Sequence, residues 1–178
     1  GSISNNKEYD AIVLSVAGLK RLSLDHLVSY KFSEDEILPA SCQGAIGIQL
    51  RSSNEELKSF LSPINHNSTE FLCQLERDVL RVINANCNSP IGLYASEIEN
   101  NIILQCEIFD HHGQKIYKNK LQSHKNLADD LGKKMGEILV LLAALLFVSS
   151  FKLFTKPSTA RNANILAASG MLLGVALT

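Results

Sequence analysis

The spacing of apolar and polar residues changes twice along this chain of 178 residues and divides it into three stretches. In the first stretch, short apolar or alternating runs predict β-strands at residues 9–16, 26–32 and 43–51. A Ser-Asn pair followed by two glutamates is typical of a helix start and predicts a helix over residues 52–64. Residues 1–62 therefore have the pattern of part of an α/β domain.

The second stretch, residues 63–137, has the pattern of a small α+β domain. Apolar residues at i, i+3 and i+4 spacing predict a long helix over residues 67–86. A polar amphipathic helix is predicted at residues 126–138. Between the helices, alternating runs joined by short polar turns predict an antiparallel meander of three strands, at residues 90–98, 101–110 and 114–121.

The third stretch, residues 138–178, is mostly apolar and predicts a helical hairpin. Its two apolar runs, 138–154 and 163–178, are joined by a basic turn at residues 156–162. Each run is shorter than the roughly 20 residues that a membrane span prefers. A buried hairpin is the alternative, but the preceding domain is too small to bury both helices. We therefore expect membrane insertion with the basic turn on the cytoplasmic side.

Composition and charge exclude several classes of function. The formal net charge is −1, which gives no electrostatic basis for nucleic-acid binding. The four cysteines form no CxxC pair, so neither a disulfide framework nor a zinc site is expected, and residues 1–137 are expected in the cytoplasm. The adjacent His111 and His112 are interpreted as part of a hairpin turn, and no metal site is predicted.

Three segments resemble segments of the porphobilinogen deaminase family and have the same order and spacing as in that family. The resemblance covers about residues 5–137. "YDAIVLSVAGLKRL" (9–22) is similar to a strand and helix start of the family, and "LPASCQGAIGIQLR" (38–51) to its crossover segment. "ERDVLRVINANCNSPIG" (76–92) resembles the signature that attaches the family's cofactor. The resemblance implies domains at 1–62 (part of the second domain and the crossover) and 63–137 (the cofactor-carrying domain).

The resemblance implies a hydroxymethylbilane synthase, a transferase of tetrapyrrole biosynthesis. Such an enzyme joins four porphobilinogens, with loss of ammonia, on a dipyrromethane cofactor held by a cysteine thioether. By match, Cys87 is that cysteine, and Arg21, Gln43 and Gly44 bind the substrate, porphobilinogen and its oligomers. The family's catalytic aspartate precedes the matched segments. No catalytic residue is therefore expected within this chain, which we expect to be a fragment that is inactive alone.

The chain departs from the family pattern at the attachment turn. Ala85 and Asn86 replace a glycine-rich pair, and Asn86 is expected to supply the left-handed backbone. Ser89 replaces a β-branched residue, and Cys42 replaces a small one.

Each assigned residue has a simpler structural reading. Taken by itself, Cys87 would be a buried free cysteine, and Arg21 a solvated surface arginine. Helix-dipole support would explain Glu76 and Asp78 without any catalytic role. Packing is the expected role of the other three cysteines, Cys42, Cys73 and Cys106.

The tail, residues 141–178, resembles the first membrane helices of the NAD(P) transhydrogenase beta subunit. The similar residues are the "KPSTAR" turn (156–161), Asn164 and "GM" (170–171). This resemblance predicts a fusion near residue 138 and membrane association. It leaves two alternatives to the enzyme: a membrane-anchored fusion that is not enzymatic, and a non-functional fusion product.

Overall fold

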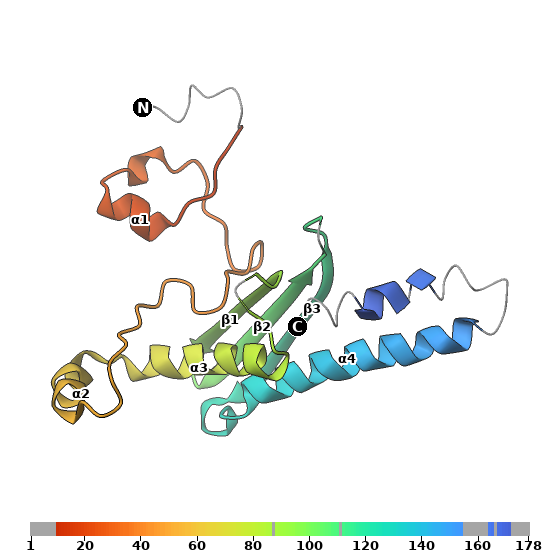
Figure 1. The fold of residues 1–178 in the computed structure, drawn as a ribbon. Helices are drawn as coiled ribbons and strands as arrows, with labels where there is room; N and C mark the ends of the chain where they lie inside the picture. The colour runs from red at the N-terminus through yellow and green to blue at the C-terminus, as the bar shows by residue number, and fades with distance from the viewer. Residues whose placement is uncertain (1–9, 87, 111, 155–163, 166, 172–178) are drawn as a thin grey trace. The chain divides into compact units, whose positions relative to one another are not determined.

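The computed structural model describes residues 10–86, 88–110, 112–154, 164–165 and 167–171 (Figure 1). By its contacts the chain divides into two compact units, Gly1–Glu36 and Ile37–Thr178. Each unit is described by itself below.

The first unit contains one short α-helix, α1 (Val16–Arg21), and a 3-10 turn, η2 (Asp25–Leu27). The strands predicted at residues 9–16 and 26–32 are wrong, since the described residues of both segments form no sheet. A strand needs a neighbour to accept and donate its backbone hydrogen bonds. No described residue of this unit is buried, so its apolar runs have no layer to pack against.

The second unit begins with an irregular segment, residues 37–54, which leads into helices. The strand predicted at residues 43–51 is also wrong, because this segment pairs with no strand among the described residues. The helix predicted over residues 52–64 is confirmed as α2 (Glu55–Leu61), followed by the 3-10 turn η3 (Ser62–Ile64). The Asn54 side chain caps α2 by accepting a hydrogen bond from Leu57 N at 3.0 Å.

A long helix and three strands follow, as the sequence predicts. The helix α3 (Asn67–Val82) begins after His66, whose side chain caps it. The strands β1 (Ile91–Ile98), β2 (Asn101–Phe109) and β3 (Lys115–His124) form an antiparallel sheet in the order β1-β2-β3. The register places Leu93 opposite Cys106 and Leu104 opposite Leu121. A short 3-10 turn, η4 (Lys125–Leu127), leaves the sheet.

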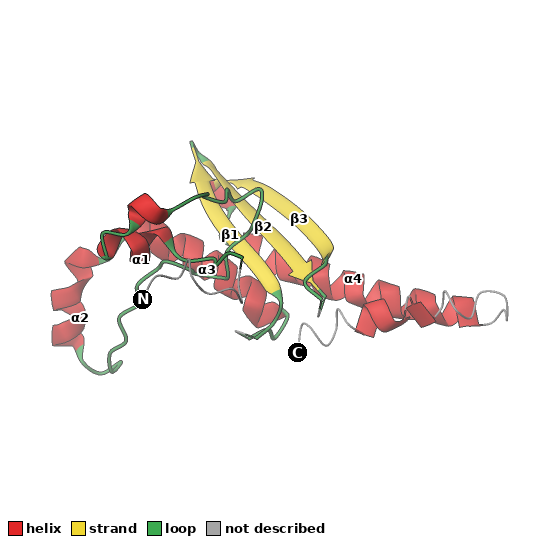
Figure 2. Cartoon of the chain, turned by 90° about the horizontal axis from the view of Figure 1, so that it is seen from above, coloured by secondary structure: helices red, strands yellow, loops and turns green. Residues whose placement is uncertain are grey.

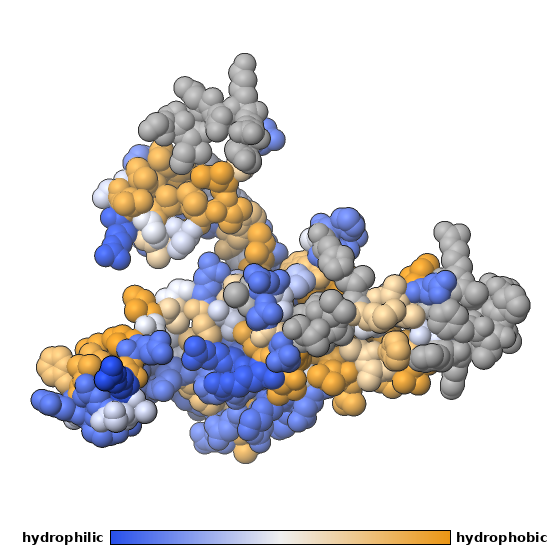
Figure 3. All heavy atoms as spheres, viewed as in Figure 1, coloured by the Kyte–Doolittle hydropathy of each residue, from blue (hydrophilic) through white to orange (hydrophobic). Residues whose placement is uncertain are grey.

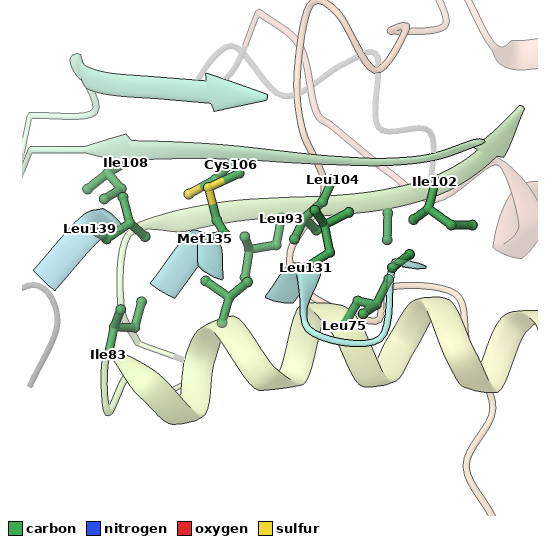
Figure 4. Close-up of a cluster of buried hydrophobic side chains, with 13 residues drawn as sticks. Leu75, Ile83, Leu93, Ile102, Leu104, Cys106, Ile108, Leu131, Met135 and Leu139 are labelled. Carbon is green, nitrogen blue, oxygen red and sulfur yellow. The ribbon is translucent and has the colours of Figure 1, made fainter. Parts of the chain in front are cut away.

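The helices α3 and α4 (Leu131–Phe154) cover one face of this sheet (Figure 2). Alternate residues of β2 point from the sheet toward the helices, as the period of two in a strand requires. Figure 4 shows the resulting core, to which four elements contribute. Leu75 comes from α3 and Ile83 from the residue that follows it, Leu93 from β1, Ile102, Leu104, Cys106 and Ile108 from β2, and Leu131, Met135 and Leu139 from α4.

Two glycines of α4 allow this helix to approach α3 very closely. A Cβ atom placed on Gly132 would lie 2.1 Å from the carbonyl oxygen of Leu75. One turn later, a Cβ on Gly136 would lie 2.6 Å from Cβ of Val82. The two glycines therefore form a notch in α4 that receives α3, and any side chain there would push the helices apart.

The helix α4 runs through residue 138 without interruption to Phe154, so the helix end predicted at that residue is wrong. Beyond the sheet, α4 exposes apolar side chains, including Leu141 (61%) and Leu145 (66%) (Figure 3). Of the predicted second arm, 163–178, the structure describes residues 164–165 and 167–171 only. Within those residues Gly170 lies against the backbone of Phe147.

Among the helices that the structure describes, none combines the length and the apolar character needed to cross a bilayer. The predicted membrane hairpin therefore has no support in the described part of the chain.

Candidate functional site

The turn that contains Cys87 joins the end of α3 to β1. Cys87 itself lies outside the described residues, but its neighbours on both sides are described. After α3, the backbone reverses at Asn84, which has a φ of 53°, and Ala85 N donates to Leu80 O at 2.9 Å. The left-handed residue is thus Asn84, and the expectation that Asn86 would fill this role is wrong. Asparagine tolerates this conformation better than most residues.

Asn86 and Ser89 instead form hydrogen bonds with each other. Ser89 N donates to Asn86 O at 3.0 Å, and Asn86 N donates to the Ser89 hydroxyl at 3.1 Å. The Asn86 side chain accepts a further hydrogen bond from Asn88 N at 2.8 Å. Asparagine and serine commonly make such local bonds. The positions immediately before and after Cys87 are therefore held by a closed set of hydrogen bonds.

A hollow of about 530 Å³ lies beside this turn, on the surface of α3. It is lined by Arg77, Leu80, Arg81, Asn84 and Ala85. Arg77 and Arg81 are four residues apart and so share one face of the helix. Two guanidinium groups and two apolar side chains thus surround the approach to the turn.

The two arginines differ in what they already bind. Arg81 pairs with Asp78 at 2.7 Å, and Gln74 Nε2 donates to the same carboxylate oxygen at 2.8 Å. Arg77 is exposed, and among the described residues no carboxylate lies within ion-pair distance of it. Arg77 is therefore the more available of the two for an acidic ligand.

A second, larger hollow of about 830 Å³ also includes Arg77. Its lining contains Cys42, Gly44 and Cys73, together with residues of the irregular segment and α2. Gly44 has a φ of 87°, a conformation that favours glycine, and it follows Gln43 in an exposed turn. Gln43 Oε1 accepts a hydrogen bond from Ala40 N at 3.3 Å, so this side chain helps to shape the turn.

Glu76 connects this turn to the helix and the sheet. Its Oε2 accepts from Cys42 N at 2.5 Å, and its Oε1 accepts from Ala95 N at 2.8 Å. Burial raises the pKa of the Glu76 carboxyl, and the backbone hydrogen bonds from Cys42 and Ala95 oppose the rise. Glu76 lies in the middle of α3, so the expected helix-dipole role is wrong, and the side chain instead joins three segments.

The structure brings only some of the predicted site residues together. Gln43 and Gly44 lie in one turn, and Gly44 lines the larger hollow. Arg77, which was not among the predicted residues, lines both hollows. Arg21 lies in the last turn of α1, in the unit that is described separately. No role was predicted for Arg77 or Arg81, although their spacing of four residues before the cysteine indicates one shared helix face.

Comparison with known proteins identifies both parts of the chain. Residues 2–59 match the family model described as "Porphobilinogen deaminase, dipyromethane cofactor binding domain". Residues 71–140 match "Porphobilinogen deaminase, C-terminal domain". Neither match extends past residue 140, and nothing found supports the transhydrogenase resemblance of residues 141–178.

Curated relatives agree with these matches. The porphobilinogen deaminase of Neisseria meningitidis serogroup A is 35% identical over 136 residues, which are 76% of this chain and 43% of that protein. The enzyme of Blochmanniella pennsylvanica is 37% identical over 134 residues, 75% of this chain and 45% of that protein. The chain thus spans less than half the length of these relatives. Since two models of one family cover most of its residues, the chain belongs to the porphobilinogen deaminase family.

Proposed function

We propose that this chain contributes the cofactor-carrying part of a hydroxymethylbilane synthase, with a dipyrromethane attached through a thioether to Cys87. The observation that carries the proposal is the arrangement of the residues that flank position 87: Asn86, Asn88 and Ser89 form a closed set of hydrogen bonds. The hollow lined by Arg77 and Arg81 reaches Asn84 and Ala85, just before that position. A cysteine thiolate is a soft nucleophile, and the thioether that it forms is stable in water. When bound, the dipyrromethane supplies the pyrrole end to which porphobilinogen units are added.

The composition of the hollow fits a group of this kind. The pyrroles carry acetate and propionate side chains, and a planar guanidinium can pair with a carboxylate through two parallel hydrogen bonds. We assign this role first to Arg77, which has no carboxylate partner among the described residues, and second to Arg81, which shares its charge with Asp78. Leu80 and Ala85 offer apolar contacts for the pyrrole rings.

Gln43, Gly44 and Arg21 are proposed to bind porphobilinogen and the growing chain. The turn at Gln43 and Gly44 is exposed on the larger hollow, where Arg77 also lies. The absence of a side chain at Gly44 leaves its backbone open to a ligand. Arg21 supplies a guanidinium at the end of α1, and no carboxylate of the chain is assigned a catalytic role.

Reconstitution tests this function. The chain would be mixed with the part of the Neisseria meningitidis relative that it does not cover, and ammonia release from porphobilinogen would be measured. We expect ammonia release from the mixture and none from either component. Cys87→Ser should abolish ammonia release, and Arg77→Ala should raise KM for porphobilinogen at least tenfold. Lys133→Ala, an exposed change on α4 outside both hollows, should leave KM unchanged. Equal activity of Cys87→Ser and wild type would refute the attachment.

A further inference from the structure

Two cysteines from different elements meet on the larger hollow. Cys42 lies in the turn before Gln43, and Cys73 lies in α3. The Cys42 thiol donates to the carbonyl oxygen of Cys73 at 3.5 Å. Both cysteines are free and half-buried. Burial and, to a smaller extent, the neighbouring Cys42 thiol together raise the pKa of Cys73 to about 11.

The backbone around Cys42 is fixed to the same helix that carries Cys73. Cys42 N donates to Glu76, which lies one turn after Cys73 on α3. Just before Cys42, Leu93 N donates to Pro39 O at 3.0 Å, and Leu38 is buried against Gly92. A disulfide forms readily only where two cysteines are held close together, and these contacts hold them so.

Packing alone explains Cys42 poorly. It has a φ of 57°, a conformation that few residues other than glycine and asparagine adopt without cost. Its side chain reaches the rim of a hollow rather than the core, in contrast to Cys106, which is fully buried in the core cluster. A thiol at this position therefore has a neighbour, a fixed backbone and access to solvent.

We propose that Cys42 and Cys73 are a modification site, at which a low-molecular-weight disulfide such as oxidised glutathione converts the two thiols into an intramolecular disulfide. The Cys42 thiolate attacks one sulfur of oxidised glutathione, whose S–S bond breaks and releases one glutathione thiolate. The Cys73 thiolate then attacks Sγ of the mixed disulfide at Cys42 and expels the second glutathione thiolate. The two protons lost by the cysteines pass to the two glutathione thiolates.

The disulfide would join the turn of Gln43 and Gly44 covalently to α3. It would hold one wall of the larger hollow against the helix that carries Arg77. This inference does not depend on the proposed function, because it concerns two thiols that the dipyrromethane attachment does not use.

Peptide mapping tests the proposal on the full chain. The protein would be incubated with oxidised glutathione, its remaining thiols alkylated, and the product digested with trypsin without reduction. Cleavage after lysine and arginine separates Cys42 (peptide 32–51), Cys73 (peptide 59–77) and the pair Cys87 and Cys106 (peptide 82–115).

We expect a species with the summed mass of peptides 32–51 and 59–77 less two hydrogens, which disappears on reduction. Cys42→Ser and Cys73→Ser should each abolish it, and Cys106→Ser, a matched change in the core, should retain it. Stable glutathione adducts on Cys42 with Cys73 alkylated, a cross-link to peptide 82–115, or a cross-link that forms only in denaturant would each overturn the proposal.

Discussion

The close approach of α3 and α4 predicts a graded effect of glycine substitutions. In Gly132→Ala the new Cβ would lie 2.1 Å from the backbone oxygen of Leu75, far inside van der Waals contact. The obstacle is backbone within a helix, so it cannot rotate away, and α4 must shift as a whole. In Gly136→Ala the nearest atom is Cβ of Val82 at 2.6 Å, which is also fixed to the backbone of α3, but the overlap is smaller than at Gly132.

The expected loss in the free energy of unfolding combines two opposing contributions. Inserting a methyl group into a well-packed interface costs about 1–3 kcal/mol, and a backbone obstacle places Gly132→Ala at or above the upper end. Alanine recovers up to about 1 kcal/mol because it favours the helix over glycine. We therefore expect a net loss of about 2 kcal/mol for Gly132→Ala and about 1 kcal/mol for Gly136→Ala.

Urea unfolding followed by far-UV circular dichroism measures these losses. With a slope of about 1–3 kcal/mol/M, the midpoint for Gly132→Ala should fall by about 1 M. Gly18→Ala is the matched control, since it also lies in a helix but has nothing within 4 Å of the new Cβ. A midpoint for Gly132→Ala equal to or above that of wild type would refute the close helix contact.

Two further predictions concern buried carboxylates. Glu76→Ala removes the acceptor of two backbone N–H groups and should lower the free energy of unfolding by about 2 kcal/mol in the same assay, whereas unchanged stability would contradict its joining role. Burial acts to raise the pKa of Glu107, but ion pairs with Lys115 (2.7 Å) and Lys118 (3.0 Å) outweigh it, so that pKa lies below its ordinary value of 4.5. The ionised Glu107 carboxylate therefore makes its full contribution to the free energy of unfolding above pH 4.5. This contribution is lost as the pH falls through the lowered pKa. As the pH is lowered, the free energy of unfolding should fall less for Glu107→Gln than for wild type. An identical fall in both proteins would contradict these ion pairs.

The sequence was a good guide where the pattern depends on neighbours close in the chain. The helix α3 and the three strands follow from apolar spacing and short turns, because a meander pairs each strand with the next. The strand predicted at residues 43–51 failed because alternation alone does not provide a pairing partner.

The prediction of a helix end at residue 138 failed for a different reason. The change in composition at residue 138 suggested a new element, but no proline or glycine interrupts the chain between Gly136 and Phe154. A helix ends where its backbone is broken or capped, not where its side chains become apolar. The helix α4 therefore continues well past the sheet.

The candidate site was only partly predictable. The motif around Cys87 predicted the attachment turn, and the spacing of Arg77 and Arg81 would have placed them on one helix face. The role of Glu76 was out of reach, because it depends on contacts with Cys42 and Ala95, which are distant in the sequence. The meeting of Cys42 and Cys73 is a long-range contact of the same kind.

The most direct test is the intact mass of this chain after incubation with porphobilinogen and the part of the Neisseria meningitidis relative that the chain does not cover. The account predicts an added mass of two linked pyrroles on the wild-type chain and none on Cys87→Ser. It would be contradicted by a wild-type mass without addition, or by an addition of equal size that persists in Cys87→Ser.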